Sequence, residues 1–243
     1  MLLAIDIGNT RIKAAVFENN TLINLDIVNP NIFSENILNI LNQHPKISNI
    51  IVSSVSNIHK NDFLAFEDRV KIEFIAKNTR MPFKNLYQTP ETLGMDRMVL
   101  SAGATLRFKN TNRLVIDTGT CITYDFIDAK NNYLGGAISP GIKMRYEALN
   151  RQTAKLPLLE NSFPKDFIGN STQESIHSGV VIGVIMEIEG FIKLYQSRYP
   201  NLEIILTGGD TDFLAMQLKN TIFANSNFLL ESMNQIFQYN QND

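Results

Sequence analysis

The chain has 243 residues, 44% of them hydrophobic, and its 22 basic and 24 acidic side chains leave a formal net charge of -2. This length accommodates two small domains, and the balanced charge argues against a nucleic-acid binder with a broad basic face. The single cysteine excludes an intramolecular disulfide. No secretory signal is recognisable at the N-terminus, and the most apolar stretch, 180–186, is shorter than the roughly 20 residues that cross a bilayer. We therefore expect a cytoplasmic protein without nucleic-acid or membrane partners.

The first half of the chain predicts strands interspersed with helices. Apolar runs with β-branched residues predict strands at 2–7, 11–17, 21–28, 50–55 and 71–75. Apolar residues at helical spacing predict helices near 33–41 and 61–70, and a third helix begins near Gly94.

The pattern restarts after the polar stretch 109–112. Strands are predicted at 113–118, 121–127, 133–139 and 203–206, and helices at 143–150 and 172–198, with another opening at 208–210. No element is assigned after that last helix. The apolar part of the long helix, 180–186, is expected to be core, with a part of it available as a homodimer face.

The two halves open in the same way. Asp6-Ile7-Gly8 and Asp117-Thr118-Gly119 each end an apolar strand, and each is followed within two residues by threonine and then by another strand. A repeated strand–Asp-x-Gly–strand unit predicts a duplicated α/β fold with mixed sheets flanked by helices, divided into domains 1–108 and 109–243 around a cleft.

These turns have the chemistry of a phosphate site. Glycine exposes backbone N–H groups and lets a phosphate approach closely. An aspartate beside a triphosphate is favourable only with a cation between them, as Mg²⁺ is in phosphoryl transfer. Lys13 adds positive charge for the transition state. The alternative is two ordinary hairpin turns, in which Asp and Gly are common. Neither a Walker-type phosphate loop nor a dinucleotide fingerprint is present.

Two further glycine-rich segments lead into predicted helices. They are Gly135-Gly136-Ala137-Ile138-Ser139-Pro140-Gly141 and Leu206-Thr207-Gly208-Gly209-Asp210. Glycines at such positions let adenosine lie against the backbone, and a helix N-terminus favours anions. Each signal alone is weak.

With these segments in order, the chain resembles the type III pantothenate kinases of the acetate/sugar kinase, Hsp70 and actin superfamily, which have two actin-like (ribonuclease H-like) domains. The Asp-x-Gly turns indicate the superfamily. Tyr87 ahead of Gly94-Met95-Asp96-Arg97, placed between the turns, makes the match specific. The resemblance implies phosphorylation of pantothenate at its primary hydroxyl with ATP, the first committed step toward coenzyme A. It also implies Mg²⁺, a monovalent cation (K⁺ or NH₄⁺) and a homodimer.

The resemblance also implies a set of site residues. Asp117 would bind the monovalent cation, and Asp6 would face Mg²⁺, directly or through water. The residues expected to hold ATP are Asp6, Ile7, Gly8, Asn9, Thr10, Arg11, Ile12, Lys13 and Thr120. Those expected to hold pantothenate are Tyr87, Gly94, Met95, Asp96, Arg97 and Thr172.

The chemistry of Asp96 and Arg97 agrees with these roles. Asp96 can accept the alcohol's proton as the alcohol attacks phosphorus, and Arg97 offers a planar fork for an anion. The alternative places Asp96 in a first helical turn with Arg97 solvated. Tyr87 can instead be a packing residue, and Thr172 can instead be the N-cap of the long helix.

Two other functions stay open at this point: another small-molecule kinase of the superfamily, and a catalytically inactive nucleotide-binding regulator. His44, His59 and His177 lack the spacing of a zinc site. Cys121 is expected to be a small core residue.

Overall fold

The computed structural model describes residues 1–8, 11–54 and 60–241. The chain forms two compact units, one of Met1–Arg107 with Asn227–Asp243 and the other of Phe108–Ser226. The junction after residue 107 lies next to the expected boundary at 108. The expected C-terminal domain, 109–243, also includes the segment from 227 onward, which by its contacts belongs to the first unit.

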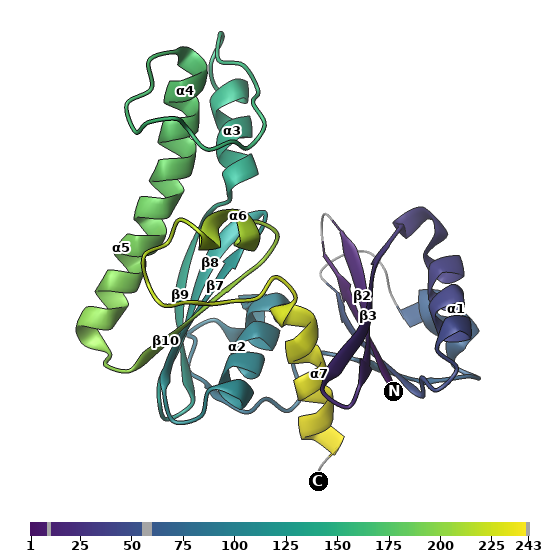
Figure 1. Cartoon of the computed structure of the whole chain (residues 1–243). Helices are drawn as coiled ribbons and strands as arrows, with labels where there is room; N and C mark the ends of the chain where they lie inside the picture. The colour runs from purple at the N-terminus through teal and green to yellow at the C-terminus, as the bar shows by residue number, and fades with distance from the viewer. Residues whose placement is uncertain (9–10, 55–59, 242–243) are drawn as a thin grey trace. The chain divides into compact units, whose positions relative to one another are not determined.

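The first unit is a mixed sheet with helices (Figure 1). Its strand order is β3-β2-β1-β4-β5, in which β1 is antiparallel to β2 and parallel to β4. Its elements are β1 (Leu2–Ile7), β2 (Ile12–Glu18), β3 (Thr21–Val28), η1 (Pro30–Ile32), α1 (Phe33–Gln43), β4 (Asn49–Ser54), η2 (Lys60–Phe66), β5 (Lys71–Phe74), β6 (Lys84–Asn85), η3 (Pro90–Thr92), α2 (Met95–Arg107) and α7 (Phe228–Gln241).

One face of this sheet forms a core with α1 and η2. Alternate residues of β1 (Leu3, Ile5 and Ile7) join that core, as the two-residue period of a strand requires. Phe63 and Phe66 of η2 are buried in the same cluster. The helix expected around 61–70 is present but shorter: η2 is a 3₁₀ helix that ends at Phe66. A spacing of three residues places both rings on one side of a helix with three residues per turn.

Helix α7 was not predicted, although its buried residues repeat at helical spacing. Phe228, Met233, Ile236 and Phe237 are among those buried. Helices α7 and α2 pack very closely, since a Cβ added at Gly103 would overlap the Ser232 side chain. The missing side chain of Gly103 therefore sets how near these two helices lie.

The second unit repeats the strand arrangement of the first. Its sheet includes the order β9-β8-β7-β10-β11, with β7 antiparallel to β8 and parallel to β10. This matching topology agrees with a duplicated fold. The elements are β7 (Asn112–Thr118), β8 (Cys121–Ile127), β9 (Asn132–Pro140), α3 (Ile142–Arg151), α4 (Thr172–His177), η4 (Ser178–Ile182), α5 (Gly183–Arg198), β10 (Leu202–Thr207), α6 (Thr211–Ala215) and β11 (Phe223–Ala224).

Helices α4 and α5 form one continuous run with a π-helical turn, η4, between them (Figure 1). Thr172–Arg198 is 27 residues long and contains an 18-residue stretch with a mean hydropathy of 1.5, so by length and composition alone this run could cross a membrane. Val181, Val184, Ile188 and Ile192 along the run are nevertheless buried in the core of the second unit. That packing is typical of the core helix of a globular domain.

Candidate active site

The first Asp-x-Gly turn joins β1 to β2. Asp6 lies at the end of β1, opposite Lys13 on β2 and beside Ser53 on β4. The Gly8 N–H donates to the Arg11 carbonyl at 3.1 Å, which closes the turn. Asn9 and Thr10, both expected to hold ATP, lie outside the described residues.

The two isoleucines of this segment have buried side chains. Ile7 and Ile12 are 0% and 4% exposed and belong to the core of the first unit. Their side chains therefore stabilise the hairpin, and only their backbone groups could face a nucleotide.

Asp6 has an unusual electrostatic environment. Burial raises its pKa from 3.8 to about 7; the charge of Lys13 opposes this rise, and the charge of Asp96 adds to it. The structure thus brings Asp6 and Asp96, which are 90 positions apart in sequence, close enough to interact. Two carboxylates held together in this way favour a shared proton or a cation.

This carboxylate pair suits Mg²⁺ that arrives with a nucleotide. Among residues 1–8, 11–54 and 60–241, no group of three or more His, Cys, Asp or Glu could hold a metal ion. Mg²⁺ in phosphoryl-transfer sites usually needs only one or two carboxylates, because phosphates and water supply its other ligands. Asp6 meets that requirement by itself.

The Gly94–Arg97 segment begins α2. Asp96 lies in the first turn, where its Oδ1 accepts a hydrogen bond from the Arg97 N–H at 2.8 Å. A Cβ on Gly94 would overlap this carboxylate oxygen. Glycine at this position therefore leaves room for the Asp96 side chain.

Arg97 is buried, at 6% exposed, so the solvated alternative is wrong for this residue. Its guanidinium carbon lies 5.7 Å from the centre of the Tyr87 ring, in a cation–π arrangement. The Tyr87 N–H in turn donates to Asn85 Oδ1 at 2.9 Å. Tyr87, Asp96 and Arg97 are therefore neighbours within the first unit, with Met95 half-buried beside them.

The second turn joins β7 to β8 in the other unit. Asp117, the residue before the last one of β7, lies between Thr123 on β8 and Thr207 on β10. The Gly119 N–H donates to the Cys121 carbonyl at 3.0 Å, so this turn closes over fewer residues than the turn at Gly8.

Both other glycine-rich segments reach this second turn. Gly208 has φ of +100°, and a Cβ there would overlap Asp117 Oδ1 and lie 2.5 Å from the Thr118 carbonyl oxygen. The Asp210 N–H donates to the same carbonyl at 3.0 Å, and burial raises the pKa of Asp210. The Gly141 N–H donates to the Thr120 carbonyl, also at 3.0 Å. This part of the site is therefore formed mainly by backbone segments that lie close to the turn, and less by side chains.

Thr172 lies at the start of α4 in the second unit. It is the exposed first residue of α4, and the N-cap is Ser171, whose Oγ accepts from the Glu174 N–H at 3.2 Å. Its N-cap alternative is therefore wrong. Nearby, a pocket of about 590 Å³ is lined by residues of α3, α4 and η4, among them Arg145, Leu149, Ile176 and Val180.

Sequence reasoning missed one polar cluster in the second unit. Glu187, on α5, contacts Tyr124, Ser139 and Arg145. The available signal was a charged residue within an otherwise apolar helical stretch, but the sequence did not indicate its partners.

Comparison with known proteins gives a consistent result. A family model described as type III pantothenate kinase matches residues 2–194. A type III pantothenate kinase from Flavobacterium johnsoniae is 55% identical over 239 residues, covering 98% of each chain. Another, from Flavobacterium psychrophilum, is 54% identical and covers 98% of this chain and 99% of its own.

Solved structures support the fold. A Campylobacter jejuni protein described as a Baf family transcriptional activator aligns with a TM-score of 0.65 at 22% identity, covering 99% of this chain and 100% of its own. A glucokinase from an Antarctic psychrotroph aligns with a TM-score of 0.55 at 12% identity, covering 98% of both chains. Both are similar in fold alone. The sequence relatives decide the family: this chain belongs to the type III pantothenate kinases.

Proposed function

We propose that the chain transfers the γ-phosphate of ATP to the primary hydroxyl of pantothenate, giving 4'-phosphopantothenate for coenzyme A biosynthesis, with Asp96 as the general base. The reaction follows from membership of the family. The observation that best supports the residue assignment is the electrostatic interaction of Asp6, at the end of the first Asp-x-Gly strand, with the proposed base Asp96 in the same unit.

The acceptor hydroxyl would be held at Asp96. Its Oδ1 already accepts from the Arg97 N–H, which fixes the carboxylate at the start of α2. We assign the other oxygen, Oδ2, to the substrate hydroxyl, whose proton it takes as the oxygen attacks phosphorus. Arg97, held against Tyr87, would bind the pantothenate carboxylate. Gly94, Met95 and Thr172 complete the proposed pantothenate contacts.

ATP would be bound by the two turns. Lys13 and backbone N–H groups of the segment from Asp6 to Lys13 would hold the phosphates from the first unit, and Thr120 from the second. When bound, Mg²⁺ would neutralise phosphate charge, and Asp6 would hold it directly or through water. Asp117 would bind a monovalent cation, K⁺ or NH₄⁺. We further propose that the enzyme is a cytoplasmic homodimer without nucleic-acid or membrane partners.

The decisive experiment follows ADP release from ATP, Mg²⁺ and pantothenate, in K⁺ and separately in Na⁺. Release should require pantothenate and be faster in K⁺. Asp96→Asn should bind both substrates but lose about 10²-fold or more in kcat, the usual size of a general-base contribution. Wild-type turnover by this variant would exclude Asp96 as the base. ADP release that does not need pantothenate would favour a different kinase.

A further inference from the structure

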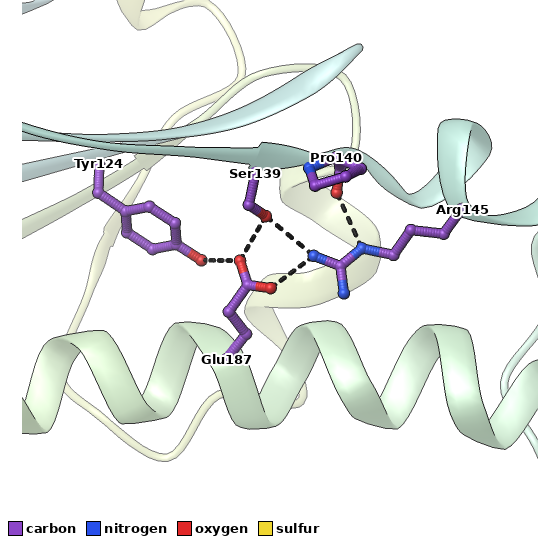
Figure 2. Close-up of polar contacts among 5 residues, drawn as sticks. All are labelled: Tyr124, Ser139, Pro140, Arg145 and Glu187. Atoms are coloured by element: carbon purple, nitrogen blue, oxygen red, sulfur yellow. Dashed lines mark hydrogen bonds and ion pairs between the residues drawn. The ribbon is translucent and has the colours of Figure 1, made fainter. Parts of the chain in front are cut away.

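Glu187 is the centre of a polar cluster that the proposed mechanism does not use. Its side chain is 23% exposed and lies on α5. Its Oε1 accepts from the Tyr124 hydroxyl at 2.9 Å and from the Ser139 hydroxyl at 2.6 Å (Figure 2). Its Oε2 accepts from Arg145 at 2.5 Å. Burial alone would raise the pKa of Glu187, but these hydrogen bonds and the charge of Arg145 outweigh burial and lower the pKa below its ordinary value. The carboxylate is thus held ionised.

Arg145 extends this cluster to the backbone. Its Nε donates to the Pro140 carbonyl at 2.8 Å, and its NH2 group donates to Ser139 Oγ at 2.9 Å as well as to Glu187 (Figure 2). The guanidinium is planar with fixed N–H directions, so it can fix one group relative to another. Arg145 therefore holds the corner where β9 ends and α3 begins against α5.

The same corner contacts the second phosphate turn. Pro140 pairs with Cys121 across the strands, and the Gly141 N–H donates to the Thr120 carbonyl at 3.0 Å. A Cβ on Gly141 would overlap the carbonyl oxygens of Gly119 and Thr120. With so little space between the two segments, a shift of the corner must move the turn.

We propose that Glu187 and Arg145 are positioning residues for ATP, which hold the corner 139–141 and through it the Thr120 turn. The inference rests on the proposed role of Thr120 in binding ATP. An ion pair that is partly exposed contributes little to stability. Such a pair can still hold the Thr120 turn in place, because the hydrogen bonds of Arg145 are directional.

The test compares two variants of the same cluster. Glu187→Gln keeps the side-chain volume but removes the charge that pairs with Arg145, and its single terminal oxygen cannot accept from both Arg145 and the two hydroxyls, which weakens the path to Arg145. We expect the KM for ATP, and the Kd for ATP without pantothenate, to rise about threefold to tenfold, with the KM for pantothenate within about twofold of wild type. Tyr124→Phe removes a hydrogen bond to the same carboxylate, but one that does not involve the corner 139–141. It should lower Tm and leave the ATP constants unchanged.

Arg145→Lys separates geometry from charge. Lysine keeps a positive charge beside Glu187 but lacks the planar fork, so the KM for ATP should also rise. Unchanged ATP constants in both Glu187→Gln and Arg145→Lys, or equal changes in Glu187→Gln and Tyr124→Phe, would overturn the proposal. Thr120→Ala tests the underlying assignment separately: if its ATP constants match those of the wild type, the role of Thr120 in binding ATP is wrong.

Discussion

Asp6→Asn should make the nucleotide-free protein more stable while it removes activity. The carboxyl pKa of Asp6 is about 7 in the folded protein because of burial, against an ordinary value of 3.8. At about 1.4 kcal/mol per pKa unit, the difference corresponds to at most about 4 kcal/mol. Since Asp6 is only half-buried by its surface, we expect about 2 to 4 kcal/mol at pH 8.

The direction follows from the protons bound in each state. Below about pH 4 both the folded and the unfolded chain hold the Asp6 proton, so the group has no effect on stability. Between about pH 4 and 7 the unfolded chain loses the proton while the folded chain keeps it, so stability falls as pH rises. Above pH 7 the folded protein carries the full cost of a buried charge. Asparagine cannot ionise and avoids this cost.

The assay is thermal unfolding from pH 5 to pH 8.5 without nucleotide. For a chain of this length, about 2 to 4 kcal/mol corresponds to a Tm increase of roughly 4 to 16 °C over wild type at pH 8, shrinking toward pH 5. Asp68→Asn, at an exposed aspartate, should give no such pH-dependent increase. An Asp6→Asn increase of equal size at pH 5 and pH 8 would refute the reasoning, because ionisation would not be its cause.

Two glycine substitutions test close backbone approach. Gly208→Ala should reduce turnover at least tenfold and destabilise the protein by about 1 to 3 kcal/mol, because its φ of +100° and the nearby Asp117 carboxylate leave no room for a methyl group; steady-state kinetics near wild-type values would contradict this. Gly103→Ala should lower the free energy of unfolding by about 2 to 4 kcal/mol, because the added methyl group would overlap Ser232 and push α2 away from α7. The control Gly190→Ala, with nothing within 4 Å of its added Cβ, should be neutral or stabilising in the same denaturant titration.

The local pattern of the sequence predicted most of the strands. Cys121–Ile127 and Thr21–Val28 form strands with the expected bounds, because turns with glycine or asparagine delimit apolar runs of strand length. The helix predicted around 61–70 forms as the shorter 3₁₀ helix Lys60–Phe66, because two aromatic residues three positions apart fit either helical period and do not fix the helix type.

Features that depend on distant residues could not be predicted in this way. Nothing in the residues near Asp6 indicates a pKa of about 7, which needs the burial and the approach of Asp96 created by folding. The partners of Glu187 come from β8, β9 and α3. The sequence shows that Gly208 and Gly141 lie in glycine-rich segments. It does not show that both segments contact the turn at Asp117, which depends on the fold.

The return of α7 to the first unit has a consequence for how the protein is made. Because Phe108–Ser226 is inserted between two parts of the other unit, a ribosome completes the inserted unit before it releases the residues that finish the surrounding one. Until then, the surface of α2 around Gly103 lacks its partner helix. Deleting the codons for α7, Phe228–Gln241, would thus damage the unit whose sheet is encoded ahead of the inserted one.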